Sequence, residues 1–132
     1  MCGIVGYVGD KKAEGILISG LKKLEYRGYD SCGISTIDGN NFDTYKTTKR
    51  ISSLEELVKK KNVDGTIGLG HTRWATHGGA TENNAHPHKS NSGKIMVVHN
   101  GIIENYLAIK EMLKDNGYMF YSETDTEVIP NL

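Results

Sequence analysis

The stretch MCGIVGYVGD, residues 1–10, places a cysteine directly after the first methionine and ahead of a short β-prone run. Ile4 to Val8 form that run, and Gly9-Asp10 ends it. Apolar residues then recur at the spacing of one helix face, so the beginning of the chain predicts a strand, a turn and a helix. The helical face comprises Ala13, Ile16, Leu17, Leu21 and Leu24.

Cys2 stands at a position that offers two reactive groups in one residue. Removal of Met1 would leave a nucleophilic thiol and, on the same residue, a free backbone amine. Such an amine titrates near about 7.7 to 8.0, so at neutral pH it can take the thiol proton directly or through a water. The alternative is that Cys2 is a small apolar residue entering a buried strand. Its position alone leaves both interpretations open.

The next segments predict a β-hairpin and a second helix. Gly33–Ile37 and Phe42–Thr47 are β-prone runs joined by DGNN, a composition typical of hairpin turns, so we expect them to pair antiparallel. Ser53 and Glu56 have the spacing of a capping box. They predict a short helix that ends at the lysine run 59–61.

Further strands are expected on either side of a long polar loop. Thr66–Thr72 and Lys94–His99 are the strand candidates, and the loop between them is rich in Gly, His, Asn and Thr. Loops of that length usually carry function. A short strand is also expected at Tyr118–Tyr121.

Two helices are expected in the last third of the chain. Glu104–Lys114 has an amphipathic pattern and is followed by Asn116-Gly117, residues that accept the left-handed conformation. Thr124 or Asp125 is expected to cap another helix from Thr126 onward. The expected buried side of the first of these helices is Leu107, Ile109, Met112 and Leu113.

The composition favours a single domain or part of one. With 132 residues, of which 37% are hydrophobic, the chain can bury a modest core. Sixteen basic residues balance sixteen acidic ones, so we expect neither nucleic acid nor a membrane surface as a partner. Apolar runs fall short of the roughly 20 residues that span a bilayer, and no signal-peptide pattern is present, which predicts a cytoplasmic protein. Cys2 and Cys32 are expected to be free thiols.

Residues 70–79, GHTRWATHGG, place binding groups where a strand becomes a loop. Arg73 offers a planar fork that fits a carboxylate, and Asp125 offers a counter-charge for an ammonium group. Together they describe an α-amino acid ligand. Taken singly, Arg73 is equally compatible with a surface ion pair and Asp125 with a plain helix cap.

All five histidines lie between residues 71 and 99, which raises the possibility of a metal site. His86 and His88 flank Pro87, but no recognised set of metal ligands is present, and no metal is expected. Histidines in such a setting more often form hydrogen bonds in polar loops or lie in strands.

Asn100 and Gly101 follow an expected strand and have the residue types of an oxyanion hole. An amide N–H and the next backbone N–H can stabilise one tetrahedral oxyanion together. The alternative is an ordinary Asn-Gly turn. Residues 65–70, GTIGLG, do not form a nucleotide-binding loop, because they lead into a strand rather than a helix N-terminus.

The motifs together resemble the class II glutamine amidotransferases, and within them the glutaminase domains of glutamine:fructose-6-phosphate aminotransferases. The resemblance extends from Cys2 to Leu132. It is carried by MCGIVG (1–6), LEYRGYDS (24–31), HTRWATHG (71–78), NAHPH (84–88), VVHNG (97–101) and SETDTE (122–127).

The resemblance implies an α+β fold of the N-terminal-nucleophile hydrolase class, a four-layer αββα sandwich with antiparallel sheets. It implies that Cys2 attacks the side-chain amide of glutamine through a thioester, that Asn100 and Gly101 hold the oxyanion, and that Arg27 supports the pocket. No cofactor is implied. The implied substrate-binding residues are Arg73 for the carboxylate, Asp125 for the ammonium, Thr76 and His77 for polar contacts, and Trp74 for closing the site.

Such a glutaminase domain is longer than 132 residues, so residues 1–132 are expected to be its N-terminal part. The ammonia would pass to sugar-phosphate isomerase domains and form glucosamine 6-phosphate. An incomplete sandwich leaves unpaired edges and an uncovered face, which predicts association with another copy or a complementary piece, or else only marginal stability. The alternative function is a fragment that binds glutamine or a partner without turnover. Cys32 is expected to be a buried, inert thiol.

Overall fold

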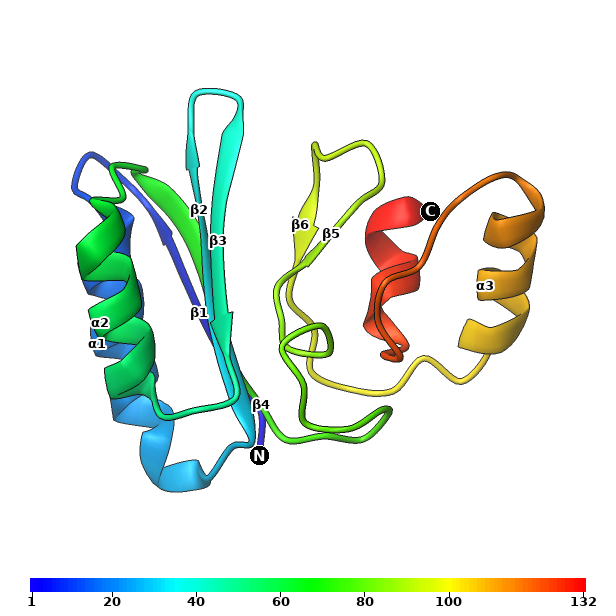
Figure 1. The fold of residues 1–132 in the computed structure, drawn as a ribbon, viewed down its shortest axis with the longest axis horizontal. Coiled ribbons are helices and arrows are strands. Elements are labelled where there is room, and N and C mark those ends of the chain that lie inside the picture. Colours follow the sequence, from blue (N-terminus) through cyan, green and yellow to red (C-terminus); the bar gives the residue numbers. More distant parts are fainter.

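The computed structural model describes residues 1–132 as two antiparallel sheets between helical layers. Figure 1 shows the order of the layers: α1 and α2, the larger sheet, the smaller sheet, and then the C-terminal helix with α3. The expected α+β, αββα arrangement is confirmed. The elements are β1 (Gly3–Val8), α1 (Ala13–Leu24), η1 (Glu25–Arg27), β2 (Ser31–Asp38), β3 (Asn41–Thr47), α2 (Ile51–Lys61), β4 (Ile67–Arg73), β5 (His88–Lys89), β6 (Met96–Val97), α3 (Tyr106–Asp115) and η2 (Thr126–Asn131).

The larger sheet has the strand order β1-β4-β2-β3, and all its pairs are antiparallel. Gly3 lies opposite Thr72, and Ser31 lies opposite Arg73. The first residues of β1 therefore lie beside the end of β4. The expected hairpin is present as β2 and β3, with Gly39 at a φ of 62° in its turn.

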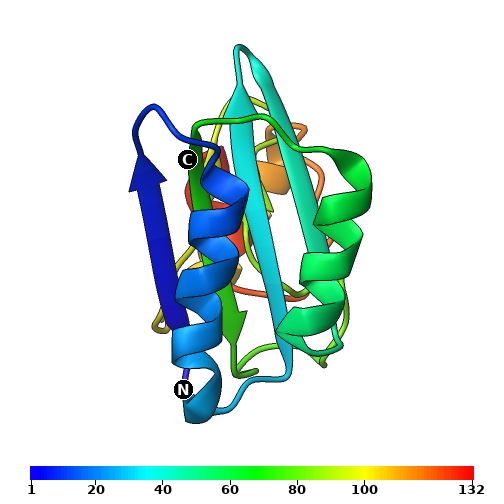
Figure 2. The same cartoon turned by 90° about the vertical axis from the view of Figure 1, so that its left-hand side faces the viewer.

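The main core lies between this sheet and the two long helices. In Figure 2 both α1 and α2 cross the near face of the sheet. Gly68 on β4 permits close approach, because a Cβ there would lie 2.7 Å from Leu17 Cδ1. Full burial of each large apolar side chain contributes about 1.5–3 kcal/mol. The core residues are Ala13, Leu17, Ile18, Leu21, Cys32, Ile34, Ile51, Leu54, Val58 and Val63.

The second half of the chain has less strand than expected. Only His88–Lys89 and Met96–Val97 pair there, so the strand predicted over Lys94–His99 is shortened to β6. No strand forms at Tyr118–Tyr121. Side chains satisfy that backbone instead, because Asn91 Oδ1 accepts from the Met119 N–H at 2.7 Å and Glu127 Oε2 accepts from the Tyr121 N–H at 2.9 Å.

Two predicted helix caps are wrong, although the last helix does begin at Thr126 as predicted. α2 begins at Ile51, so Ser53 is not a cap: its backbone N–H bonds to the Arg50 carbonyl within the first turn. α2 does end at Lys61, in the predicted lysine run. The C-terminal element η2 is a 3-10 helix, and Asp125 makes no side-chain capping bond. Neither the capping-box spacing nor an aspartate before a helix was sufficient evidence for a cap.

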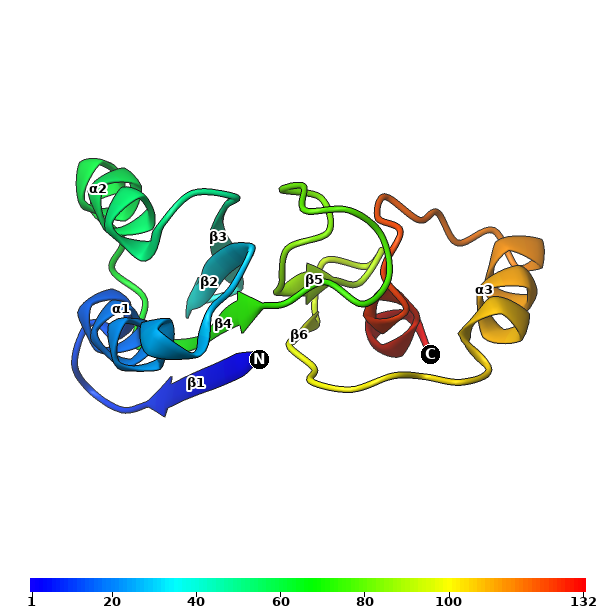
Figure 3. The ribbon, with the colours of Figure 1, turned by 90° about the horizontal axis from the view of Figure 1, so that it is seen from below.

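The predicted buried side of α3 is largely wrong. Leu113 is buried, but Leu107 is 64% exposed and Met112 is 49% exposed. In Figure 3 α3 lies at the far end of the molecule from α1 and α2, beside the C-terminal helix. α3 packs mainly against η2, and part of its apolar stripe remains exposed. The predicted helix end is confirmed, with Gly117 at a φ of 89°.

None of the helices is long and apolar enough to cross a membrane.

Candidate active site

Cys2 lies where the two halves of the molecule meet. The β1–β4 register brings it next to the end of β4, and its Sγ accepts a hydrogen bond from the Trp74 N–H at 3.2 Å. The half-buried thiol lines a cavity of about 230 Å³. The cavity walls are Cys2, Arg73, Trp74, Thr76, His86, His99, Gly101, Ile102, Thr124, Asp125 and Thr126.

Arg73 is a buried residue of the cavity wall, and some of the N–H donors of its guanidinium are already hydrogen-bonded within the protein. It is 3% exposed, and its Nη atoms donate to the carbonyl oxygens of His77, Gly78 and Gly79. Asp30 Oδ1 lies 3.9 Å from Nη1. A guanidinium has five N–H donors, so two remain after these three bonds. Arg73 therefore orders the loop after β4 and retains donors for an anion.

Asp125 lines the same cavity as a buried carboxylate. Its Oδ2 accepts from the Ile103 N–H at 2.7 Å, and its Oδ1 accepts from the Thr126 hydroxyl at 3.5 Å. His77 Nδ1 is 3.9 Å from Oδ2. A carboxylate offers about four lone-pair sites, so Asp125 keeps acceptor capacity toward a cation. One cavity thus holds a partly free cation, a partly free anion and a thiol.

Asn100 and Gly101 follow β6 and reach the cavity only in part. Gly101 lines it, at a φ of 146° that disfavours other residues. Asn100 is exposed, and its Oδ1 lies 2.7 Å from His71 Nε2. Asn100 is not among the residues that line the cavity, so the structure brings only one of the two predicted oxyanion donors to its wall.

The other predicted site residues occupy different positions around the thiol. Trp74 and Thr76 line the cavity, and the Trp74 side chain is 56% exposed. His77 lies outside the wall and packs edge-on against Tyr106 at 5.0 Å. Arg27 is also outside the wall: its Nη2 lies 3.6 Å from Met1 Sδ, and its carbonyl accepts from the Met1 amine at 3.2 Å.

Three buried histidines form a stack between the two halves of the molecule. His71 and His86 are stacked with ring centroids 4.1 Å apart, and His88 packs edge-on against His86 at 4.6 Å. Burial lowers the pKa of His71 to about 4 and that of His88 to about 3, and it also lowers the pKa of His86. The rings are therefore neutral near pH 7. No group of three His, Cys, Asp or Glu side chains is arranged to hold a metal ion.

Sequence reasoning missed several residues of the site. His86 and His99 were considered as metal ligands, but they line the thiol cavity together with Thr124 and Thr126. His99 Nδ1 lies 3.2 Å from the Thr126 hydroxyl. Asp30 was also missed, although its Oδ2 accepts from the Ala75 N–H at 2.6 Å and so fixes the loop after β4. For Asp30, His99, Thr124 and Thr126 the available signal was their presence within the same motifs as predicted residues; His86 lay in a motif without one.

The second thiol differs sharply from the first. Cys32 is fully buried in the core, and burial raises the pKa of its thiol to about 12. The prediction of an inert, free Cys32 is confirmed.

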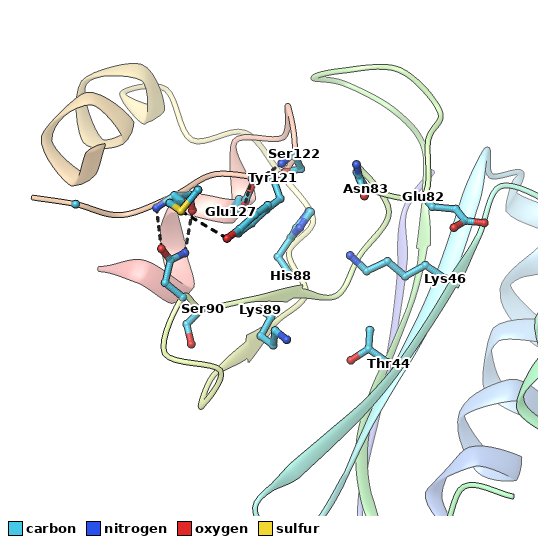
Figure 4. A pocket seen from close by; sticks show the side chains of 13 residues that line it. Thr44, Lys46, Glu82, Asn83, His88, Lys89, Ser90, Tyr121, Ser122 and Glu127 are labelled. Atoms are coloured by element: carbon cyan, nitrogen blue, oxygen red, sulfur yellow. Dashed lines mark hydrogen bonds between the residues drawn. The ribbon is translucent and has the colours of Figure 1, made fainter. Parts of the chain in front are cut away.

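A larger cavity, of about 780 Å³, lies elsewhere and contains none of the predicted site residues. Figure 4 shows it between β3 and the segments around His88 and Ser122, with Lys46 reaching across it. Burial lowers the pKa of Lys46 to about 8, and Glu127 on the far wall partly counters this. Glu127 already accepts from the Ser122 hydroxyl and backbone N–H. This cavity contains no cysteine and none of the residues of the thiol cavity, so it is the weaker candidate for thiol chemistry.

A thiol directly before the first strand of an antiparallel sheet, in one cavity with a cation and an anion, is typical of amidotransferases of the N-terminal-nucleophile hydrolase class. Two solved structures share the fold. Glutamine phosphoribosylpyrophosphate amidotransferase from B. subtilis, complexed with ADP and GMP, has a TM-score of 0.79 and 28% identity over 97% of this chain and 28% of its own. A structure described as the allosteric regulatory enzyme of purine biosynthesis has a TM-score of 0.80 and 31% identity with the same coverage.

A glutamine amidotransferase domain model matches residues 58–132. The chain belongs to the glutamine amidotransferase family. It is 60% identical to the isomerizing glutamine–fructose-6-phosphate aminotransferase of Caldanaerobacter subterraneus subsp. tengcongensis, and 59% identical to that of Methanococcus maripaludis. Each match covers the whole chain but only 22% of the relative, so the chain spans about a fifth of the length of these relatives.

Proposed function

We propose that residues 1–132 carry the catalytic half of a glutaminase, in which Cys2 hydrolyses the side-chain amide of glutamine. The observation that carries the proposal is the shared cavity of Cys2, Arg73 and Asp125. Arg73 would bind the substrate carboxylate with a remaining donor, and Asp125 would bind its ammonium group. Trp74 and Thr76 would complete the cavity wall. His77, whose Nδ1 lies 3.9 Å from Asp125 Oδ2, would help to hold that carboxylate in place.

The proposed chemistry begins with the thiol proton. The α-amine of Cys2, free after loss of Met1, takes that proton, and the thiolate attacks the amide carbon. The Nδ2 of Asn100 and the N–H of Gly101 stabilise the oxyanion. The ammonium of Cys2 returns the proton to the departing nitrogen, which leaves as ammonia. Water then cleaves the thioester to give glutamate and the free thiol.

The ammonia is proposed to serve an aminotransferase reaction. The relatives at 60% and 59% identity are named glutamine–fructose-6-phosphate aminotransferases. By likeness to them, the acceptor would be fructose 6-phosphate, held by isomerase domains that follow this part of the polypeptide, with glucosamine 6-phosphate as product. A homo-oligomer in the cytoplasm is part of the same proposal.

The test is glutamate release by the full-length polypeptide that contains residues 1–132. Cys2→Ala is expected to abolish release, because Cys2 carries the only thiol in the cavity. Cys32→Ala is the matched control and is expected to keep the wild-type rate, because Cys32 lies in the core. The electrophile 6-diazo-5-oxo-norleucine is expected to label Cys2 stoichiometrically. Labelling at Cys32, or glutamate release by Cys2→Ala, would refute the assignment.

A binding function without turnover is the second candidate. It is favoured by one observation: Asn100, the proposed oxyanion donor, is exposed and lies outside the cavity wall. Glutamine binding by calorimetry together with no glutamate release by the wild-type protein would support this alternative.

A further inference from the structure

One contact links the buried histidine stack to the proposed oxyanion hole. His71 is fully buried on β4, and its Nε2 lies 2.7 Å from Oδ1 of the exposed Asn100. Amide oxygens only accept hydrogen bonds, so Nε2 must be the donor. Nδ1 of His71 has no partner, which fits an unprotonated acceptor nitrogen. The bond therefore specifies the neutral Nε2–H tautomer, in agreement with a His71 pKa lowered to about 4 by burial.

The orientation of the Asn100 amide decides what that side chain can do. With Oδ1 held by His71, the Nδ2 group is directed away from the histidine and presents its N–H donors elsewhere. If the amide rotated by half a turn, Oδ1 would take the place of Nδ2, and an oxyanion there would meet a carbonyl oxygen instead of a donor. An exposed asparagine has little else to prevent that rotation, because Asn100 Oδ1 makes no other hydrogen bond.

His71 is itself held by rigid neighbours. It belongs to β4, a central strand of the larger sheet, and its ring is stacked on His86 with an interplanar angle of 12°. His86 Nδ1 accepts from the His99 N–H at 3.3 Å, which fixes the backbone directly before Asn100. The stacked rings of His71 and His86 therefore bond both the side chain of Asn100 and the backbone of the residue before it.

We infer that His71 is a positioning residue for glutamine hydrolysis, acting only through Asn100 by holding its amide with Nδ2 toward the oxyanion. This inference rests on the proposed function. His71 does not line the cavity and touches no reacting atom.

The test compares His71→Leu, His71→Gln and Asn100→Ala, each in the full-length polypeptide. Removing one oxyanion donor costs about 100- to 1,000-fold in kcat. In His71→Leu the Asn100 amide is free to turn away from the oxyanion, which is expected to lower kcat about 10- to 100-fold. KM for glutamine should change little, since the hydrogen bond from Asn100 to the oxyanion forms only in the transition state. His71→Gln keeps an amide N–H near the position of Nε2 and is expected to restore most of the rate.

The double variant His71→Leu/Asn100→Ala is the decisive measurement. If His71 acts through Asn100, the double variant is as slow as Asn100→Ala alone, because a contact already lost cannot be lost again. Alkylation of Cys2 by iodoacetamide needs no oxyanion hole and should proceed at the wild-type rate in His71→Leu. Thr36→Val removes a different buried polar atom without a hydrogen-bond partner, the Thr36 hydroxyl, and serves as the structural control.

Different results overturn different claims. Wild-type kcat in His71→Leu, or multiplied losses in the double variant, would overturn the role of His71 while leaving the glutaminase assignment intact. Undiminished glutamate release by Cys2→Ala would overturn the proposed function itself.

Discussion

Mild acid is expected to unfold this protein through its buried histidines. Burial lowers the pKa values of His71, His86 and His88 below the ordinary value of 6.5. Above about pH 6.5 these rings are neutral in both the folded and the unfolded chain. Below it, the unfolded chain binds protons that the folded chain cannot accept. Stability is therefore lost as the pH falls from about 6.5 toward about 4.

The size of the effect follows from proton linkage. Each histidine contributes about 1.4 kcal/mol per pH unit once the unfolded form is mostly protonated, and about 1 kcal/mol between pH 6.5 and 5.5. Three histidines together give a loss of about 3 kcal/mol over that first unit and about 4 kcal/mol over the next. Domains of this size are stable by about 5–15 kcal/mol, so unfolding near pH 5 is expected.

Urea denaturation followed by circular dichroism at a series of pH values measures this slope. His88→Gln removes one titrating ring and is expected to reduce the slope by about one third, because glutamine does not bind a proton. Thr36→Val changes a buried side chain without changing titration and should keep the wild-type slope. A free energy of unfolding that stays level between about pH 6.5 and 5, or an unchanged slope in His88→Gln, would refute the reasoning.

Three further changes test other parts of the structure. Gly33→Ala would place a Cβ 2.2 Å from the His86 carbonyl oxygen. Urea denaturation is therefore expected to show a loss of stability of about 2 kcal/mol or more, and glutamate release is expected to be slower. Wild-type stability would contradict this prediction. Lys46→Met is expected to stabilise the protein by about 1–3 kcal/mol at pH 7, because burial lowers the pKa of Lys46 from 10.5 to about 8 and its charge is disfavoured. That gain should shrink as the pH rises from about 8 to about 10.5, and a gain that does not depend on pH would contradict it. A variant that retains Met1, as verified by intact mass, should lose about 100-fold or more in kcat, because the proposed base, the α-amine of Cys2, is then part of a peptide bond. Its Cys2 thiol should still be alkylated.

The first half of the fold was predictable because its signals are local. Periodic apolar residues located β1 and α1, and the DGNN turn located the β2–β3 hairpin. The second half was less predictable because it is held by side chains that bond to backbone. The carboxylate of Glu127 satisfies residues 121 and 122, which therefore need no strand partner. β-propensity alone does not reveal that a side chain will take the place of a neighbouring strand as the hydrogen-bond partner of the backbone.

The residues of the candidate site also fall into a group that the sequence predicted and a group that it did not. Cys2 and Arg73 were candidates from residue type and position, and Trp74 from the family resemblance. In the structure the three residues line one cavity, and Cys2 Sγ accepts from the Trp74 N–H. His71 and His86 carried no such signal, because their contribution depends on a stack between β4 and a loop that follows it by more than ten residues. The sequence indicated histidines in polar loops and strands, which is where they lie, but not which atoms they hold.

The cavity has walls from both halves of the molecule, and this couples its chemistry to folding. Cys2 and Arg73 come from the larger sheet, whereas Gly101 and Asp125 come from the segments beyond it. Among the contacts that join the halves are neutral imidazoles, and Gly33 leaves the space that lets the His86 backbone approach the sheet. A change that separates the halves should therefore disable the site before it melts the core between α1, α2 and the sheet. Activity would then be lost at a higher pH than helical structure, because the stack protonates only when it opens.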